Sequence, residues 1–282
     1  MLQIKIINTQ KALSPTQISI APYVINPYRG CTMGCVYCYA KNNKNVKSRL
    51  HLWGKFLDVK KNLPSILRKE LESISVSHVL IGSTCEPFVK EEQKFKITQK
   101  TLEILNENKV SYTILTRSIH IKNVLHLIRE GKNNKVYFTI NFLDFSIKRK
   151  FEPFIDYTLH DTIKLIQDLY NLKINFRLYI SPFIPQLIKL EDIFSMFGKY
   201  CRDFFIEVYN PKMGSWEVVR SILESYLSQN LINIFEDEIS YSLFKENFLK
   251  EVRLLKRRFP YTIGYYLPPS LNQYYSPFIF YG

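Results

Sequence analysis

The feature that most restricts the fold of this chain is a repeated alternation of short apolar segments with longer amphipathic ones. The short segments are rich in Val, Ile, Phe, Tyr and Thr, and they have the length of buried strands in a parallel sheet. They lie at residues 21–26, 78–83, 111–116, 135–142, 175–181 and 203–209. Between them, apolar residues recur with helical spacing at 97–108, 120–130 and 159–172. This alternation predicts βαβ units, and therefore a parallel sheet or barrel.

The last seventy residues follow a different pattern. Residues 216–229 and 241–259 are typical of helices, and an aromatic, proline-rich tail follows at 261–282. The tail has two interpretations: a further strand at 261–267, or a cover over one end of a barrel. No repeat, Gly/Ser linker or long charged block marks a domain boundary. The expected parts are a lead-in at 1–20, a core at 1–210 and an extension packed on it at 211–282.

Composition sets the class of protein. Of the 282 residues, 46% are hydrophobic and 23% are charged, which excludes a disordered chain. No apolar run reaches about 18 residues, so we expect no membrane-spanning helix. The N-terminus lacks the pattern of a secretory signal, so we expect a cytoplasmic enzyme. The net charge of +14 fits a polyanionic partner. It equally fits a compositional bias, because the cations are spread along the chain except at 256–258.

Three of the five cysteines, Cys31, Cys35 and Cys38, lie within the segment NPYRGCTMGCVYCYAK. Clustered thiols in a chain without an export signal indicate metal or redox ligands. Three thiolates from one loop can hold three irons of a [4Fe–4S] cluster and leave the fourth iron open for chemistry. Gly30 and Gly34 allow the loop to turn tightly. The alternatives are a zinc site, although zinc modules favour C-x2-C pairs, and three buried apolar thiols.

The spacing C-x3-C-x-aromatic-C after a first strand resembles the radical S-adenosylmethionine (SAM) superfamily. The longer cysteine segment is similar to its spore photoproduct lyase-like branch. Five further segments resemble that branch in the same order: GSTCEPFVKEE, ILTRS, VYFTIN, FEPF and YISPFIP. The similarity covers about residues 22–210. It implies an α/β fold, a partial (β/α)6 TIM-like barrel of the radical SAM type, with a C-terminal helical and aromatic extension.

The resemblance also implies an activity. SAM would bind the open iron of the cluster, and one electron would cleave SAM to methionine and a 5′-deoxyadenosyl radical that abstracts hydrogen from the substrate. Flavodoxin or ferredoxin is the implied type of electron donor. The branch and the positive charge favour a nucleic-acid substrate. Two alternatives stay open: a maturase of a protein, peptide or tRNA, and a non-catalytic, metal-stabilised nucleic-acid-binding protein.

Several residues are implied as cofactor contacts. Tyr37 stands where the superfamily packs an aromatic ring against adenine. Arg117 replaces a common Lys and is the implied partner of the SAM carboxylate. Thr139 and Asn141 share one face of the fourth strand and are implied to reach ribose, unless Asn141 only completes a loop. The end of the second strand is implied to bind the methionine amino group or ribose through Ser83, Thr84 and Glu86.

Cys85 is a candidate catalytic thiol. Spore photoproduct lyases use a second-strand cysteine as a hydrogen-atom donor, in a motif like Ser-Cys-Thr-Ser-Asp. Aligning that acidic residue with Glu86 places Ser83 at the donor position and Cys85 two residues later, on the same face. This departure puts thymine-dimer repair in question. The alternative is that Cys85 is a buried apolar residue, which is also the expectation for Cys201.

Overall fold

The computed structural model describes residues 1–212 and 215–271. The chain folds as two compact units, which are described one at a time. The first unit consists of Met1–Gly34, Ala40–Phe138 and Phe154–Phe176. The second consists of Cys35–Tyr39, Thr139–Pro153 and the chain from Arg177 onward.

The main sheet of the first unit has the strand order β8-β7-β6-β3-β2. β3, β6, β7 and β8 pair in parallel, and only the short β2 is antiparallel. The central strands are buried on both faces: Leu80, Ile114 and Val136 have no exposed surface. The bounds are β2 (Ser14–Pro15), β3 (Tyr23–Ile25), β6 (His78–Ile81), β7 (Ser111–Thr116) and β8 (Lys135–Ile140), whose last two residues belong to the second unit.

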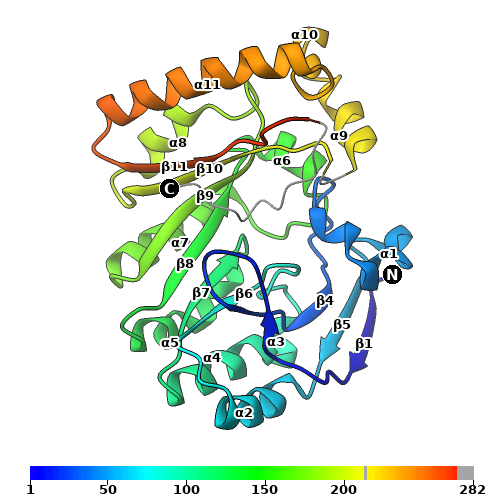
Figure 1. Cartoon of the computed structure of the whole chain (residues 1–282), viewed down its shortest axis with the longest axis vertical. Coiled ribbons are helices and arrows are strands. Elements are labelled where there is room, and N and C mark those ends of the chain that lie inside the picture. The colour runs from blue at the N-terminus through cyan, green and yellow to red at the C-terminus, as the bar shows by residue number, and fades with distance from the viewer. Residues whose placement is uncertain (213–214, 272–282) are drawn as a thin grey trace. The chain divides into compact units, whose positions relative to one another are not determined.

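Helices connect these strands, as Figure 1 shows. α7 (Leu159–Asn171) begins at a capping box, in which Thr158 accepts from the Asp161 amide and Asp161 binds back to Thr158. The stretch expected as one helix at 120–130 is a 3-10 helix followed by an α-helix. The other helices of this unit are α2 (Leu63–Ser73), α3 (Glu92–Phe95), α4 (Ile97–Glu107), η3 (Ile119–Val124) and α5 (Leu125–Glu130).

A second, three-stranded sheet in the first unit was not expected from the sequence. Its order is β1 (Gln3–Ile7), β5 (Phe56–Lys60) and β4 (Tyr28–Gly30), with β1 parallel and β4 antiparallel to β5. β4 ends one residue before the first clustered cysteine. The antiparallel pairing of β4 with β5 therefore brackets the segment that carries the cysteines. Short helices occupy that segment: η1 (Tyr39–Asn42), α1 (Lys44–Lys47) and η2 (Leu50–Leu52).

The second unit contains the parallel strands β9 (Asn175–Phe183), β10 (Asp203–Val208) and β11 (Thr262–Tyr266). The first two residues of β9 belong to the first unit. An aromatic core joins sheet and helices, with Phe194 against Phe204 at 4.6 Å between ring centroids. The helices are α6 (Phe145–Phe151), α8 (Leu190–Phe197), α9 (Trp216–Leu223), α10 (Gln229–Ile232), η4 (Asn233–Phe235) and α11 (Glu238–Arg258).

The α/β prediction is confirmed, because the sheets are mostly parallel. Of the two interpretations of residues 261–267, the structure has the further strand, β11. One helix prediction was too long, because α9 ends at Leu223 and tightens into i→i−3 hydrogen bonds at Ser225 and Tyr226. α11 begins earlier than expected, since Asp237 accepts from the Ser240 amide and caps it. The rest of the predicted aromatic tail, residues 272–282, lies outside the described residues. Within them, no helix is both long and apolar enough to cross a membrane.

Candidate functional site

The cysteine loop begins directly after β4. Gly30 has φ +82°, and a Cβ atom there would lie 2.3 Å from the Phe56 ring. Gly34 has φ +67°, and a Cβ atom there would lie 2.5 Å from the Phe154 ring. Both positions therefore require glycine, as the sequence predicted for a tightly turning loop.

The three clustered cysteines are divided between the units: Cys31 belongs to the first, Cys35 and Cys38 to the second. Cys31 and Cys35 are buried, Cys38 is half-buried, and none of them forms a disulfide. Among the described residues, no three His, Cys, Asp or Glu side chains converge on a position for one metal ion. A four-iron cluster does not require such convergence, because each thiolate binds a different iron. The donor set, three thiolates in a C-x3-C-x2-C pattern, fits such a cluster.

Within the first unit, two arginines form ion pairs with one buried carboxylate next to the loop segment. Asp58 on β5 has no exposed surface and binds Arg29 Nε and Arg49 Nη1, each at 2.7 Å. The Arg49 guanidinium also lies over the Phe56 ring, 4.0 Å from its centroid. One carboxylate thus joins an arginine before the cysteines to one after them, which fixes the two ends of the loop relative to each other.

Asn26, which follows β3, contacts three of the predicted residues just after the end of β6. Its Nδ2 donates to Ser83 Oγ at 3.2 Å, and its Oδ1 accepts from the Thr84 amide at 2.9 Å. Cys85 Sγ lies 3.7 Å from the same Oδ1. Lys60 Nζ donates to the Asn26 carbonyl at 2.8 Å, and burial lowers the pKa of Lys60. Ser83, Thr84 and Cys85 therefore lie together around Asn26, which stands between β3 and β4.

Glu86 joins the ends of β6 and β7. Its carboxylate accepts from Thr116 Oγ1 at 2.5 Å, from the Arg117 amide at 3.0 Å and from the Phe88 amide at 3.0 Å. Burial raises the pKa of the Glu86 carboxyl above its ordinary value, although these hydrogen bonds lower it. Tyr157 adds a bond from its hydroxyl to the Arg117 carbonyl at 2.9 Å. The structure thus brings Glu86 and Arg117 together, but through the main chain of Arg117.

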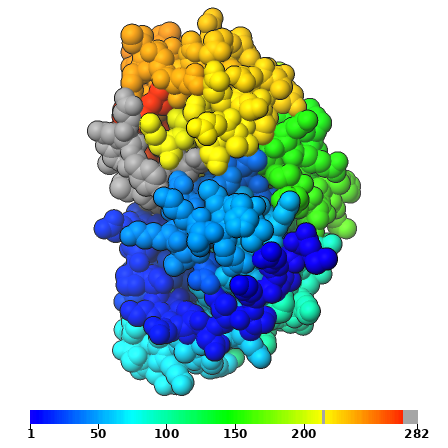
Figure 2. All heavy atoms as spheres, turned by 90° about the vertical axis from the view of Figure 1, so that its right-hand side faces the viewer, coloured from blue at the N-terminus to red at the C-terminus, as the bar shows by residue number. Residues whose placement is uncertain are grey.

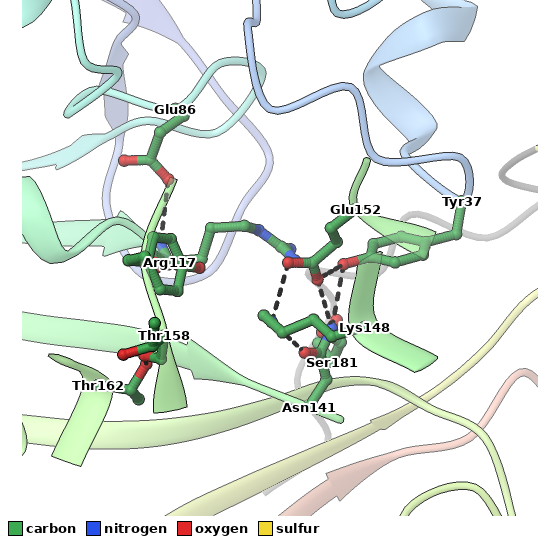
Figure 3. Close-up of polar contacts among 10 residues, drawn as sticks. Tyr37, Glu86, Arg117, Asn141, Lys148, Glu152, Thr158, Thr162 and Ser181 are labelled. Atoms are coloured by element: carbon green, nitrogen blue, oxygen red, sulfur yellow. Dashed lines mark hydrogen bonds and ion pairs between the residues drawn. The ribbon is translucent and has the colours of Figure 1, made fainter. Parts of the chain in front are cut away.

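The second unit contains a buried polar network around Glu152 (Figure 3). The Tyr37 hydroxyl donates a hydrogen bond to Glu152 Oε1, and Asn141 Nδ2 donates to the same oxygen at 2.7 Å. Lys148 Nζ lies 2.8 Å from Glu152 Oε2 and donates to Asn141 Oδ1 at 2.6 Å. Asn141 also donates to the Ser181 carbonyl at 3.4 Å. We call these five residues the Glu152 network.

The structure brings two predicted residues, Tyr37 and Asn141, into this network. The Tyr37 ring lies 6.5 Å from the Phe151 ring between centroids, tilted by 38°. Thr139 is half-buried on β8, two residues before Asn141, and is not part of the network. Cys201 is buried, as expected of a structural residue, and burial raises the pKa of its thiol to about 11.

Sequence reasoning missed Asn26, Lys148 and Glu152. Asn26 and Glu152 stand within segments that carried the family resemblance, NPYRGC and FEPF, which is the signal that could have found them. Lys148 had no such signal. A lysine four residues before a glutamate is usually an exposed helix pair, whereas both side chains are buried here.

Comparisons with known sequences agree with the cysteine motif. A family model described as the radical SAM superfamily matches residues 25–192, more than half of the chain. An uncharacterized protein of Methanocaldococcus jannaschii is 28% identical over 253 residues, which cover 89% of this chain and 93% of that protein. An uncharacterized protein of Mycobacterium bovis is 26% identical over 123 residues, which cover 39% of this chain and 33% of that protein.

Solved structures agree in fold. A spore photoproduct lyase variant with bound AdoMet and dinucleoside spore photoproduct matches with a TM-score of 0.58 and 15% identity, covering 80% of this chain and 68% of that one. SuiB of Streptococcus suis bound to S-adenosylmethionine matches with a TM-score of 0.51 and 16% identity, covering 87% of this chain and 47% of that one. With the family match and the cysteine spacing, the conclusion is direct: this chain belongs to the radical SAM superfamily.

Proposed function

We propose that this protein is a radical SAM enzyme in which Cys31, Cys35 and Cys38 hold a [4Fe–4S] cluster. The observation that carries the proposal is the C-x3-C-x2-C loop, bracketed by β4 and β5, in a chain of this superfamily. When bound, the cluster supplies the electron that cleaves SAM into methionine and a 5′-deoxyadenosyl radical. We propose a small acidic redox protein, a flavodoxin or ferredoxin, as the electron donor.

The protein's own residues bind and orient SAM in this proposal. Tyr37, Ser83, Thr84, Arg117 and Thr139 are the proposed SAM contacts. We infer that Glu86 and Asn141 position the residues that contact SAM. Their own polar atoms already bind Thr116, Arg117, Lys148 and Glu152. We propose a catalytic core at residues 1–210, which contains the family match, and an extension at 211–282.

A nucleic acid is the substrate class that we propose. The net charge of +14 supports it, because neutralised phosphates release counterions. Exposed cations follow the cysteine loop, at Lys44, Lys47 and Lys55. Figure 2 shows this segment, in light blue, at the surface of the first unit. The spore photoproduct lyase neighbour holds a dinucleoside spore photoproduct, which is consistent with this substrate class.

Anaerobic reconstitution tests the cofactor proposal. The wild-type chain should bind about four irons, and it should release 5′-deoxyadenosine when reduced in the presence of SAM. Alanine at any clustered cysteine should abolish both, whereas Cys201→Ser should retain both. A colourless protein that holds a single zinc would contradict the proposal.

The substrate proposal needs its own test. The reconstituted enzyme should bind DNA or RNA oligonucleotides with an affinity that falls steeply as salt rises. Substrate-dependent formation of 5′-deoxyadenosine should follow. Cys85→Ala should then change the product if the thiol donates a hydrogen atom, and leave it unchanged if Cys85 only packs. Salt-independent, weak binding together with turnover on a peptide would exclude nucleic acid as the substrate class.

A further inference from the structure

The last residue of α6, Phe151, and its C-cap residue, Glu152, each form a hydrogen bond with the segment between Cys35 and Cys38. The Val36 amide donates to the Phe151 carbonyl at 2.9 Å, and the Tyr37 hydroxyl donates to the Glu152 carboxylate. Val36 and Tyr37 are the only two residues that separate the second clustered cysteine from the third. The end of α6 therefore holds every residue of this interval, one through its main chain and one through its side chain.

The carboxylate that binds Tyr37 is itself fixed. One oxygen of Glu152 meets Lys148 Nζ at 2.8 Å, and the other accepts from Asn141 Nδ2 at 2.7 Å. Lys148 also donates to Asn141 at 2.6 Å, so Glu152, Asn141 and Lys148 form a triangle of three pairwise contacts. Glu152 and Asn141 have no exposed surface, and Lys148 is 4% exposed. No member can move alone without leaving a buried polar partner unpaired, which is costly.

Charge and hydrogen bonding suggest what this triangle does. Lys148 and Glu152 form a buried pair with no net charge, so the pair adds little electrostatic potential at the neighbouring thiols. Its effect on the loop is instead directional, through the orientation of one carboxylate oxygen toward the Tyr37 hydroxyl (Figure 3).

We propose that Glu152, fixed by Asn141 and Lys148, is a positioning residue for the Cys35–Cys38 half of the cysteine loop. By holding Val36 and Tyr37, the end of α6 keeps these two thiols ordered before the cluster binds. The inference rests on the proposed function for its biological meaning. Its structural content concerns the metal-free chain and can be tested there.

The test measures cysteine alkylation in the full-length, metal-free chain under anaerobic conditions. Cys31, Cys35 and Cys38 fall in one tryptic peptide, from Gly30 to Lys41, and fragment-ion spectra separate the three sites. Tyr37→Phe should raise the iodoacetamide rate at Cys35 and Cys38 by about fivefold, which corresponds to losing one hydrogen bond of about 1 kcal/mol. Glu152→Gln should raise it at least as much, because it also leaves the Lys148 charge uncompensated. The rate at Cys31 should stay unchanged.

Tyr209→Phe is the matched control for Tyr37→Phe. Tyr209 is also a buried tyrosine of the second unit, and its hydroxyl has no hydrogen-bond partner within the described residues. This variant should leave all three rates unchanged. Equal increases at Cys31, Cys35 and Cys38 would indicate general unfolding and overturn the proposal, as would the absence of any change.

A pair of charge variants separates positioning from electrostatics. Glu152→Gln leaves the Lys148 charge uncompensated, and Lys148→Met leaves the Glu152 charge. An electrostatic role would move the rates at Cys35 and Cys38 in opposite directions, because a nearby cation favours the reactive thiolate and an anion disfavours it. A positioning role predicts that both variants raise these rates. Opposite directions would overturn the proposal.

Reconstitution then distinguishes this inference from the proposed function. If the wild-type chain binds the cluster, Glu152→Gln should take up iron more slowly and Glu152→Asp should recover part of the difference. Iron uptake by Glu152→Gln at the wild-type rate, despite faster alkylation, would remove the link to cluster binding. A wild-type chain that binds no cluster would contradict the proposed function, while the alkylation result would still decide the positioning of the loop.

Discussion

Two of the buried glutamates, one from each unit, are held by partners of different chemistry. Glu86 of the first unit is held by a hydroxyl and two main-chain amides, all neutral donors. Glu152 of the second unit is held by an ammonium group, an amide and a phenol. Desolvation is costly for both carboxylates, but only Glu152 has a directly bonded buried cation. Burial alone therefore does not set the free-energy cost of a buried carboxylate, because the charge of its partners also contributes.

The largest effect should come from removing the paired carboxylate. Glu152→Ala leaves Lys148 buried and uncompensated, and such a broken pair costs about 3–5 kcal/mol. Urea unfolding of the metal-free chain, followed by circular dichroism, measures this loss. Glu246→Ala removes an exposed glutamate of α11 and should not change the unfolding midpoint measurably. A small loss for Glu152→Ala would mean that Lys148 reaches water when its partner is removed.

Replacing both members of the pair should be less damaging than replacing one. The double variant Lys148→Met with Glu152→Leu puts apolar side chains of similar volume in place of both charges, and such replacements are often close to neutral. Here the change leaves Asn141 and Tyr37 without their partners, so we expect a residual loss of about 1–3 kcal/mol. A double-mutant cycle from urea unfolding checks the coupling. Additive losses would show that the two side chains do not act as a pair.

The different partners of the two glutamates also explain what the sequence could and could not predict. β7 was predicted at its observed bounds, Ser111–Thr116, because its period and composition are local properties. The cysteine spacing is equally local, and it identified the family. The Lys148–Glu152 pair was not predictable, because the same spacing on an exposed helix is common and only tertiary packing buries it. β4 was missed because three residues carry too little pattern.

Glu86 gives a smaller loss with a distinct pH dependence. Glu86→Gln should cost about 1–3 kcal/mol, because an amide offers one acceptor oxygen to several donors. Burial raises the pKa of Glu86 above its ordinary value of 4.5, so the folded state binds its proton more tightly than the unfolded state does. This carboxyl therefore contributes a stability that is present at low pH and is lost as pH rises from the unfolded pKa through the folded one.

The measurement for Glu86 is the free energy of unfolding of the wild type and of Glu86→Gln at several pH values above 4.5. The wild type should lose stability relative to the variant as pH rises through that window, since glutamine does not titrate. A difference that is constant across the window would mean that Glu86 titrates alike in the folded and unfolded chains. The neutral donors would then fully offset the cost of burying the Glu86 charge.

The smallest effect should come from one neutral donor to Glu86. Thr116→Val keeps the shape of a buried β7 side chain but removes the hydroxyl that donates to Glu86 and accepts from the Ser118 amide. We expect a loss of about 1 kcal/mol in unfolding free energy. Thr116→Ser restores the hydroxyl and should recover most of the loss, apart from the missing methyl group. Because the hydroxyl stabilises the charged form of Glu86, the loss in Thr116→Val should also grow as pH rises and the carboxyl ionises. A loss that does not depend on pH would place the hydroxyl's main role at the Ser118 amide instead.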